Sequence, residues 1–222
     1  MIPILCIVGK SSSGKTTLLA DLIPELKAIG FKVAVVKHVP HGSDVDVHGK
    51  DSWRFLKAGG VHALVSGPGQ IAHFSSAEGD ASLRDFIPMV WDCDILLAEG
   101  YKESIYPKIE VVRKDFGLDL LADKNQIVAV VSEAEIPVSV PRFRPSETAA
   151  LAEFIAETYI LPAREETETV LSINGVQVPL KPFAQRFFAR AILGMADSLK
   201  GIDSLESLSI HIRNNAAERK SS

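Results

Sequence analysis

The sequence has 222 residues and a mass of 24.0 kDa, a length that allows one large domain or one domain with a small appendage. Hydrophobic residues make up 46% and charged residues 23%, which is ordinary for a globular protein and excludes wholesale disorder. The formal charge of −4 argues against a surface devoted to nucleic acid or to an anionic membrane. We therefore expect neither nucleic acid nor a membrane as a partner.

The N-terminal segment and the two cysteines bear on location and redox chemistry. Residues 1–8 are apolar, but they are too short to cross a membrane and lack the basic region of a signal peptide. We therefore expect a cytoplasmic protein. Cys6 and Cys93 stand far apart without a C-x-x-C spacing, which favours two buried, reduced thiols over a zinc site or a disulfide.

Apolar runs and helical periodicities alternate along the first 160 residues. Short apolar runs predict strands at residues 1–8, 31–36, 61–66, 70–74, 94–98, 108–113 and 127–131. Apolar residues at helical spacing predict helices over 15–28, 51–58, 83–90 and 146–159. Strands that alternate with helices in this way predict an α/β fold built on a doubly wound, mostly parallel sheet.

The pattern changes after residue 160. Residues 161–168 are polar, contain a proline and predict a linker. Beyond it, Asn174-Gly175 between two short apolar segments predicts a β-hairpin. An amphipathic helix over 182–200 and a strand over 205–212 complete a small ββαβ appendage over 169–214, and we expect residues 215–222 to form a frayed tail.

The most specific motif follows the first strand. Residues 9–16 match G-x-x-x-x-G-K-[ST] at every fixed position, between a buried strand and an amphipathic helix. The two glycines let successive N–H groups turn toward phosphate oxygens, and the helix adds its positive N-terminal end. We therefore expect residues 1–160 to be a nucleotide-binding domain of the P-loop NTPase type. Its candidate phosphate-binding residues are Gly9, Lys10, Ser11, Ser12, Ser13, Gly14, Lys15, Thr16 and Thr17.

A phosphate loop of this kind needs a Mg²⁺ site. Lys15 supplies a positive charge to the β- and γ-phosphates, and the Thr16 hydroxyl is a natural Mg²⁺ ligand. Glu99 follows the strand at 94–98, where an acidic residue at the carboxyl end of a strand faces the phosphates. We expect Thr16 and Glu99 to serve the metal and Lys15 and Glu99 to be the catalytic candidates. The alternative for Glu99 is a solvated residue at a strand end.

A second group of polar residues lies in the loop after residue 36. Lys37, His38, Asp46 and Asp51 fit a switch-like loop beside Mg²⁺ and the γ-phosphate, because the loop after the second strand lies near the phosphates in this topology. The His38-x-x-His41 spacing also suggests zinc, but no cysteine or later histidine completes a tetrahedral set. A solvated loop with Asp51 as a helix cap is the third interpretation.

Together with the phosphate loop, several segments resemble MobB, the family of molybdopterin-guanine dinucleotide biosynthesis accessory proteins. The resemblance covers roughly residues 1–160 in the family's order. It is carried by Val35-Val-Lys37-His38-x-x-His41, Asp46-x-x-Gly49-Lys50-Asp51-Ser52-Trp53-Arg54, Leu96-Leu97-Ala98-Glu99-Gly100-Tyr101-Lys102 and Pro107-Lys108-Ile109-Glu110-Val111-Val112-Arg113.

The resemblance implies a homodimer that binds GTP with Mg²⁺ and hydrolyses it weakly. It implies a role beside the guanylyltransferase MobA, which joins GMP to molybdopterin, and it points to molybdopterin or molybdoenzyme chaperones as further partners. Carried over by position, residues 9–17 bind phosphates, Thr16 and Glu99 serve Mg²⁺, and residues 37–52 form the family's second signature.

Two features depart from the expected pattern. No Asn-Lys-x-Asp guanine-reading motif is present, and Ser132-Glu133-Ala134 follows the strand at 127–131, so a preference for guanine rests on the resemblance alone. The appendage lies beyond the core family pattern. Its apolar helix face either packs into a small core of its own or serves docking or dimerisation.

Three classes of function remain open at this point. The first is an accessory GTPase, and the second is a P-loop kinase that phosphorylates a small metabolite, although no arginine-rich lid segment precedes residue 160. The third is a binding protein with a structural nucleotide. Four further cations have two interpretations, a basic surface for a pterin phosphate or ordinary solvated charge. They are Lys108, Arg113, Arg142 and Arg144.

Overall fold

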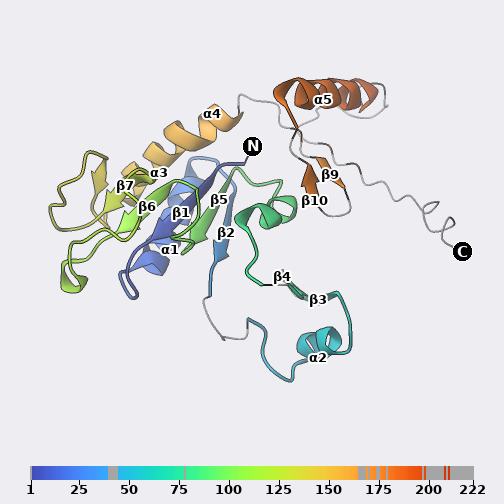
Figure 1. The fold of residues 1–222 in the computed structure, drawn as a ribbon, viewed down its shortest axis with the longest axis horizontal. Helices are drawn as coiled ribbons and strands as arrows, with labels where there is room; N and C mark the ends of the chain where they lie inside the picture. Colours follow the sequence, from blue (N-terminus) through green and yellow to red (C-terminus); the bar gives the residue numbers. More distant parts are fainter. Residues whose placement is uncertain are drawn as a thin grey trace, which may run out of the picture. The chain divides into compact units, whose positions relative to one another are not determined.

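The computed structural model describes residues 2–39, 45–77 and 79–164, and then residues 169, 171–173, 176–178, 180–196, 198, 208 and 210 (Figure 1). The chain divides into two compact units, residues 2–163 and the part from residue 164 onward. The first unit contains the central sheet and all of the candidate site residues that the structure describes.

A six-stranded sheet with the order β2-β5-β1-β6-β7-β8 forms the centre of the first unit. All neighbouring pairs are parallel, which confirms the predicted α/β fold. The two-residue β8 escaped prediction because it is too short to show periodicity. The strands are β1 (Ile4–Val8), β2 (Val33–Lys37), β5 (Ile95–Glu99), β6 (Lys108–Val111), β7 (Ile127–Val131) and β8 (Arg142–Phe143).

The three central strands are buried along their whole length, which explains their uninterrupted apolar sequences. Every residue of β1, β5 and β6 is buried. A strand in a parallel sheet is covered on both faces, so its sequence is a continuous hydrophobic run and does not alternate. The charged side chains on these strands, Glu99, Lys108 and Glu110, are therefore exceptions that need partners.

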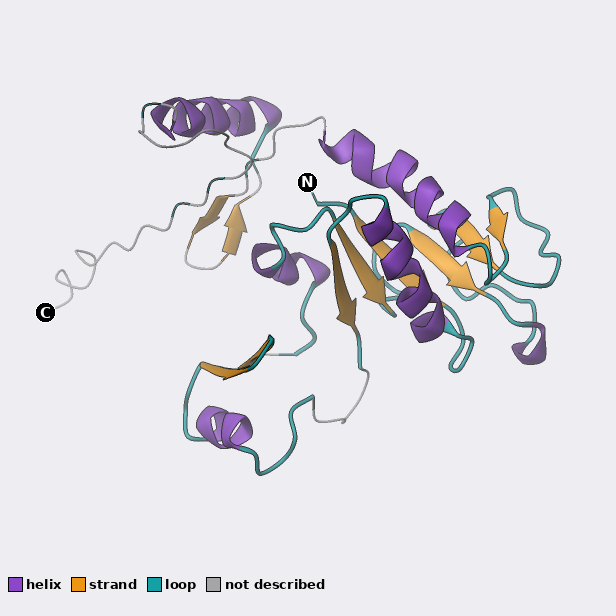
Figure 2. Ribbon diagram, turned by 180° about the vertical axis from the view of Figure 1, so that it is seen from behind, coloured by secondary structure: helices purple, strands orange, loops and turns teal. Residues whose placement is uncertain are grey.

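Different elements cover the two faces of the sheet. Helices α1 (Lys15–Ala28) and α3 (Thr148–Ile155) lie on one face, where Leu22 and Ile155 join the core around Leu5 and Ile7 (Figure 2). The 3₁₀ helix η1 (Leu83–Met89) and several loops cover the other face, where Leu83 and Ile87 pack in the core that includes Cys6. Helix α1 has the bounds that the apolar spacing predicts.

The last helix of this unit continues past its expected end. A π-helical turn, η3 (Ala156–Ile160), and α4 (Leu161–Arg164) follow α3 without a break. The expected linker at 161–168 is therefore wrong for residues 161–164, whereas residues 165–168 lie outside the described residues. Proline removes a helix N–H and its ring clashes with the preceding turn. The wider turn directly before Pro162 makes room for the ring and lets the helix continue.

The segment between β2 and η1 forms local structure of its own. Helix α2 (Asp51–Lys57) is followed by an antiparallel hairpin of β3 (His62–Gly67) and β4 (Gln70–Ser75). Pro68-Gly69 forms the tip, as the Gly-Pro-Gly sequence predicts, and Gly69 has φ +76°. The hairpin is a separate sheet, not a part of the central one.

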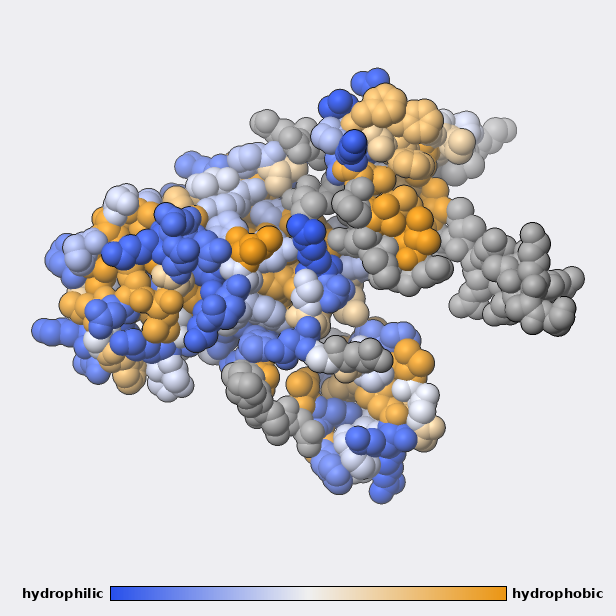
Figure 3. Space-filling view, viewed as in Figure 1, coloured by the Kyte–Doolittle hydropathy of each residue, from blue (hydrophilic) through white to orange (hydrophobic). Residues whose placement is uncertain are grey.

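The second unit contains the predicted hairpin, β9 (Leu171–Ile173) with β10 (Val176–Val178), and helix α5 (Pro182–Ala196). On the apolar face of α5, for which the sequence left a small core or a docking role open, Phe183 is 75%, Phe187 60% and Met195 70% accessible. Figure 3 shows this hydrophobic surface over α5. No helix within the described ranges has the length and apolarity that crossing a membrane requires.

Two expectations for the C-terminal part fall largely outside the described residues. The strand predicted over 205–212 is represented only by Leu208 and Ile210, and neither belongs to a strand. The tail expected over 215–222 lies entirely outside the described residues.

A buried carboxylate on β6 generates the first prediction. Glu110 is 1% exposed and accepts backbone N–H groups from Leu121 at 2.6 Å and Ala122 at 3.1 Å. We expect Glu110→Gln to lower the free energy of unfolding by about 1–3 kcal/mol, because an amide offers one acceptor where two are used. Urea unfolding of this variant and of Glu103→Gln, an exposed position, measures the difference. Equal midpoints would contradict the prediction.

Candidate functional site

The phosphate loop connects β1 to α1 and packs against the end of β6. Gly9 has φ +146° and Gly14 has φ +98°, backbone conformations that side chains disfavour. A Cβ built at Gly9 would lie 2.4 Å from the Val111 carbonyl oxygen and 2.8 Å from Ser13 Oγ. Position 9 therefore requires glycine, because the backbone of the loop passes too close to the Val111 carbonyl for a side chain.

Lys15 points back into this loop. Its Nζ donates to the carbonyl oxygens of Gly9, at 3.0 Å, and Lys10, at 2.8 Å. Helix α1 begins at Lys15, and the first N–H groups of a helix have no partner inside it. The loop thus places an ammonium group beside a helix N-terminus, an arrangement that attracts phosphate.

Thr16, Glu99 and Lys37 meet beside the loop. Thr16 Oγ1 lies 3.0 and 2.9 Å from the two carboxylate oxygens of Glu99. Lys37 Nζ lies 3.2 Å from Glu99 Oε1 and 3.5 Å from Thr16 Oγ1. Glu99 is 8% exposed, so its charge needs these partners. Hydroxyl and carboxylate oxygens are ligands that Mg²⁺ prefers, so Thr16 and Glu99 fit a metal at this position.

The sheet register explains this meeting. Glu99 is the last residue of β5 and lies opposite Ile7 on β1 and Lys37 on β2. Because the strands are parallel, their carboxyl ends share one edge, which is also where the phosphate loop begins. The sequence predicted that this strand ends at residue 98, whereas β5 extends one residue further and includes Glu99.

His38 continues β2 alongside the turn after Glu99. Its N–H donates to the Glu99 carbonyl oxygen at 3.0 Å, and its ring centroid lies 5.0 Å from that of Tyr101. His38 Nε2 is 3.6 Å from Asp80 Oδ2. Tyr101 adopts φ +55°, and burial, with a smaller contribution from the Asp80 charge, raises the pKa of its phenol. The sequence did not single out Tyr101 or Asp80 as site residues.

The rest of the expected switch-like loop forms local contacts. Asp46 Oδ1 accepts hydrogen bonds from Val47 N–H at 2.8 Å and Ser52 Oγ at 3.0 Å, and Asp51 begins α2. Across the described ranges, neither aspartate has a hydrogen bond or an ion pair with the phosphate loop or Glu99. The structure therefore brings Lys37 and His38 to Glu99, whereas Asp46 organises the start of α2.

The zinc alternative finds no further ligands. His41 lies outside the described residues, and no three His, Cys, Asp or Glu side chains are grouped as a metal site requires within the ranges that the structure describes.

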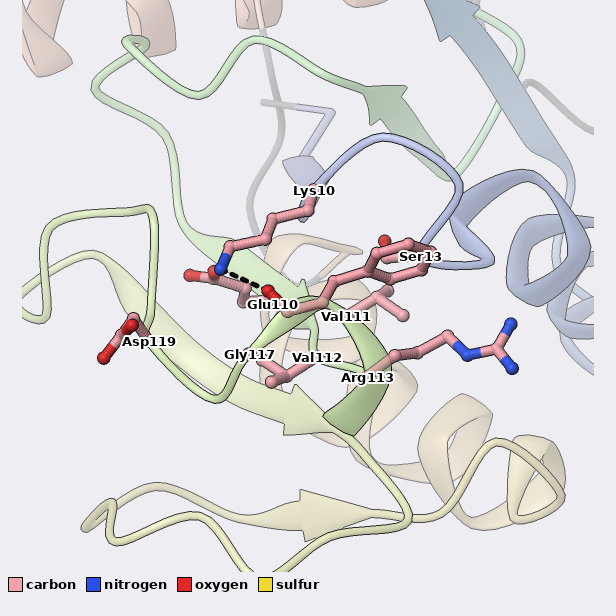
Figure 4. Close-up of a pocket in the computed structure, with 9 residues that line it drawn as sticks. Lys10, Ser13, Glu110, Val111, Val112, Arg113, Gly117 and Asp119 are labelled. Carbon is pink, nitrogen blue, oxygen red and sulfur yellow. Dashed lines mark hydrogen bonds between the residues drawn. The ribbon is translucent and has the colours of Figure 1, made fainter.

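Lys10 ties the phosphate loop to the segment after β6. Its Nζ donates to the Phe116 carbonyl oxygen at 2.6 Å, in the 3₁₀ turn η2 (Lys114–Phe116) (Figure 4). The side chain of Lys10 is thus directed at protein, although it was expected among the phosphate-binding residues. Ser13 is buried, and its Oγ has no hydrogen-bond partner among the described residues, which leaves this hydroxyl available at the loop.

Lys108 does not belong to a basic surface. It is 0% exposed, and its Nζ donates to the carbonyl oxygens of Ser104 at 2.5 Å and Tyr106 at 2.9 Å and to Gln126 Oε1 at 2.7 Å. Burial lowers the pKa of this ammonium group. Lys108 therefore fixes the segment that leads from Glu99 into β6. Both alternatives that the sequence left open for Lys108, a basic surface and ordinary solvated charge, are therefore wrong for this residue.

Comparisons with known proteins agree on one family. The family model for molybdopterin guanine dinucleotide synthesis protein B, MobB, matches residues 4–133. Molybdopterin-guanine dinucleotide biosynthesis adapter proteins of Haemophilus influenzae and Escherichia coli are 34% and 33% identical, over 69% and 71% of this chain and 88% and 93% of theirs. A crystal structure of molybdopterin-guanine biosynthesis protein B is 29% identical with a TM-score of 0.55, covering 69% of this chain and 97% of its own.

The contact between Gly9 and β6 generates the second prediction. We expect Gly9→Ala to lower the free energy of unfolding by about 1–3 kcal/mol, because the added methyl group overlaps the Val111 carbonyl. Gly67→Ala is the matched control, since a Cβ there meets no atom within 4 Å. Thermal and urea unfolding of both variants measure the effect. A Gly9→Ala protein as stable as the control would show that the loop does not need this close approach.

Proposed function

The chain belongs to the MobB family and is an adapter of molybdopterin-guanine dinucleotide biosynthesis, and from this premise we propose that it performs the role as a Mg²⁺-dependent GTP-binding protein with weak GTPase activity. The observation that carries the proposal is the cluster of Thr16, Glu99 and Lys37 beside the loop that holds Lys15. Such a cluster binds a metal and a nucleoside triphosphate at one place.

Each group in the cluster has a distinct task in this proposal. Lys15 and the N–H groups at the start of α1 bind the phosphates. Thr16 and Glu99 hold Mg²⁺, which neutralises charge on the phosphate oxygens. Lys37 balances the carboxylate of Glu99, and the rings of His38 and Tyr101 pack together beside the turn that follows it.

The proposed turnover is slow because the cluster lacks groups that accelerate hydrolysis. Among the described residues, no arginine or glutamine has a hydrogen bond or an ion pair with Thr16, Lys37 or Glu99. An arginine or a positioned glutamine stabilises the transition state or orients water in fast GTPases. A partner protein would supply such a group, and we propose a MobA-type guanylyltransferase as that partner.

The remaining parts of the proposal concern assembly. We propose that the protein works as a homodimer in the cytoplasm and also contacts molybdopterin or molybdoenzyme chaperones. Residues 1–160 would provide nucleotide binding, whereas the exposed apolar face of α5 would serve docking. The alternative of a kinase that phosphorylates a small metabolite is not favoured by the adapter family.

Equilibrium titration with fluorescent GTP and ATP analogues, with and without Mg²⁺, tests the proposed function. Tighter binding of GTP than of ATP, with a requirement for Mg²⁺, supports it. Hydrolysis measured with and without a MobA-type guanylyltransferase then tests the adapter role, since the partner should raise the rate. Absence of nucleotide binding, or equal binding of both nucleotides, would contradict the proposal.

Lys15 provides the third prediction. Lys15→Ala should weaken GTP binding at least about tenfold, because charge-assisted hydrogen bonds to the phosphates are lost. Lys27→Ala removes a lysine from the last turn of the same helix and should leave affinity unchanged. Circular dichroism shows whether both variants are folded. Full affinity in Lys15→Ala would exclude the loop as the phosphate site.

The metal cluster provides the fourth prediction. Thr16→Val and Glu99→Gln should each remove most of the increase in GTP affinity that Mg²⁺ gives to the unmodified protein, because each loses a metal ligand. Titrations at several Mg²⁺ concentrations measure this dependence. Glu103→Gln removes an exposed carboxylate near the same segment and is the control. An unaltered Mg²⁺ dependence in both site variants would place the metal elsewhere.

A further inference from the structure

A cavity of about 440 Å³ opens beside the phosphate loop, and most of its lining has no role in the site described above. One wall is formed by the loop and the start of α1, including Ser13, Gly14 and Thr17. Another part of the lining is formed by residues 111–115, which begin with the last residue of β6, and by Glu133 after β7. Its volume is typical of pockets for small ligands. Because its first wall is the phosphate loop itself, a group attached to bound phosphates can reach it.

The sheet topology also favours a ligand at this position. In the sheet, β5 and β2 lie on one side of β1, and β6, β7 and β8 lie on the other. The strand order therefore reverses between β1 and β6. Ligands of open parallel sheets bind outside the carboxyl ends of the strands at such a reversal. The cavity lies at the ends of β6 and β7, immediately next to the end of β1.

Glu133 is an exposed residue that lines this cavity, and it lies on a turn with several hydrogen bonds. On one side of it, Ser132 N–H donates to the Phe143 carbonyl oxygen at 2.9 Å, and the Ser132 hydroxyl accepts Ala134 N–H at 3.1 Å. Arg142 spans the turn, with Nη1 at 3.2 Å from the Ser132 carbonyl oxygen and Nη2 at 2.8 Å from Glu135 Oε1. Among the described residues, nothing bonds to the Glu133 carboxylate.

The other carboxylates of the cavity differ from Glu133. Asp115 Oδ2 lies 3.8 Å from Arg113 Nη2, so its charge already has a partner. Asp21 lies on the same wall as the phosphate loop, one helical turn after Thr17. Glu133 instead lines the cavity from the turn just after β7, at the carboxyl end of that strand.

We propose that Glu133 determines base specificity by accepting two hydrogen bonds from a 2-amino-4-oxopyrimidine edge, the edge of the guanine base whose phosphates lie on the loop. This inference rests on the proposed function and adds a residue to it. A carboxylate has two acceptors and no donor. The guanine edge offers the ring N–H and the amino group side by side, and charge-assisted pairs of this kind are strong.

Adenine does not match a carboxylate in the same way. Its edge offers an amino donor beside a ring nitrogen that is itself an acceptor, so one carboxylate oxygen would face a lone pair. A site built to hydrogen-bond a substrate rejects an analogue that leaves its polar groups unpaired. Glu133 would therefore supply the selectivity that an Asn-Lys-x-Asp motif, which this chain lacks, would otherwise supply.

The same edge is present in pterins, which carry a 2-amino-4-oxo ring as guanine does. Two sources of one chemistry therefore have to be distinguished, the base of the bound nucleotide and a free pterin. The continuity of the cavity with the phosphate loop favours the base of the nucleotide.

Competition binding with the full chain tests the proposal. The probe is a ribose-labelled fluorescent GTP analogue bound to the unmodified protein, to Glu133→Gln or to Asp21→Asn. The competitors are GTP, ATP, ITP, XTP and 6-hydroxymethylpterin. We expect Glu133→Gln to reduce the GTP-to-ATP affinity ratio about 10- to 100-fold. It should also improve XTP binding, because the amide N–H can donate to the xanthine 2-oxo group. ITP, which lacks the amino group, should bind the unmodified protein more weakly than GTP does.

Asp21→Asn is the matched control, because it removes one negative charge from the same cavity and should leave the ratio unchanged. An unchanged ratio in Glu133→Gln, or an equal loss in Asp21→Asn, would overturn the proposal. Pterin that binds while the nucleotide analogue stays bound, and that needs Glu133, would overturn the assignment to the nucleotide base. If the unmodified protein binds no nucleotide at all, the proposed function is refuted instead.

Discussion

The parallel alignment of β5, β1 and β6 is the constraint on which the candidate site depends. Their register places Ile7 opposite Glu99 and Val8 opposite Glu110, so the carboxyl ends of all three strands reach the same edge of the sheet. The phosphate loop leaves that edge after β1 and is pressed against the Val111 carbonyl at the end of β6. A shift of one residue would separate Thr16 from Glu99 in the first pairing or change the close contact between Gly9 and Val111 in the second.

Charged residues on the buried strands fall into two groups with different consequences. Glu99 lies at the strand end, where its carboxylate contacts Thr16 and Lys37 beside the phosphate loop. Lys108 and Glu110 lie two residues apart on β6 and are satisfied by loop carbonyls and loop N–H groups, respectively. These contacts fix the course of the loops around the edge. The Pro-Lys-Ile-Glu segment is thus a structural part of the family pattern, whereas Glu-Gly-Tyr bears on the site.

The geometry favours binding over rapid chemistry, which agrees with an adapter. The described residues offer a phosphate loop, one hydroxyl, one carboxylate and a lysine beside it, which in the proposed function bind a nucleotide and its metal. The slow turnover that we propose would suit an adapter, because partners could respond to the nucleotide state before it changes. The exposed apolar face of α5, in the second unit, is a separate surface that such a protein can use for recognition.

The sequence alone determined the parts of this protein that depend on local pattern. The match at residues 9–16 and the apolar spacing of α1 predicted a loop and helix with the observed bounds, and continuous apolar runs predicted a buried, mostly parallel sheet. The family resemblance was confirmed because it rested on several motifs in a fixed order. These features are encoded by residues that are neighbours in the chain.

Only the tertiary structure decided which distant residues meet. In the structure, Lys37 pairs with Glu99, and Lys10 donates to the Phe116 carbonyl oxygen. Lys108 is buried with Gln126, and Asp46 bonds to Ser52. A cavity lies between the start of α1 and Glu133. The tertiary structure also carried the helix through Pro162 and exposed the apolar face of α5. A sequence pattern reports periodicity and residue type, whereas such contacts follow from strand order, register and loop path, which are set by packing across the whole sheet.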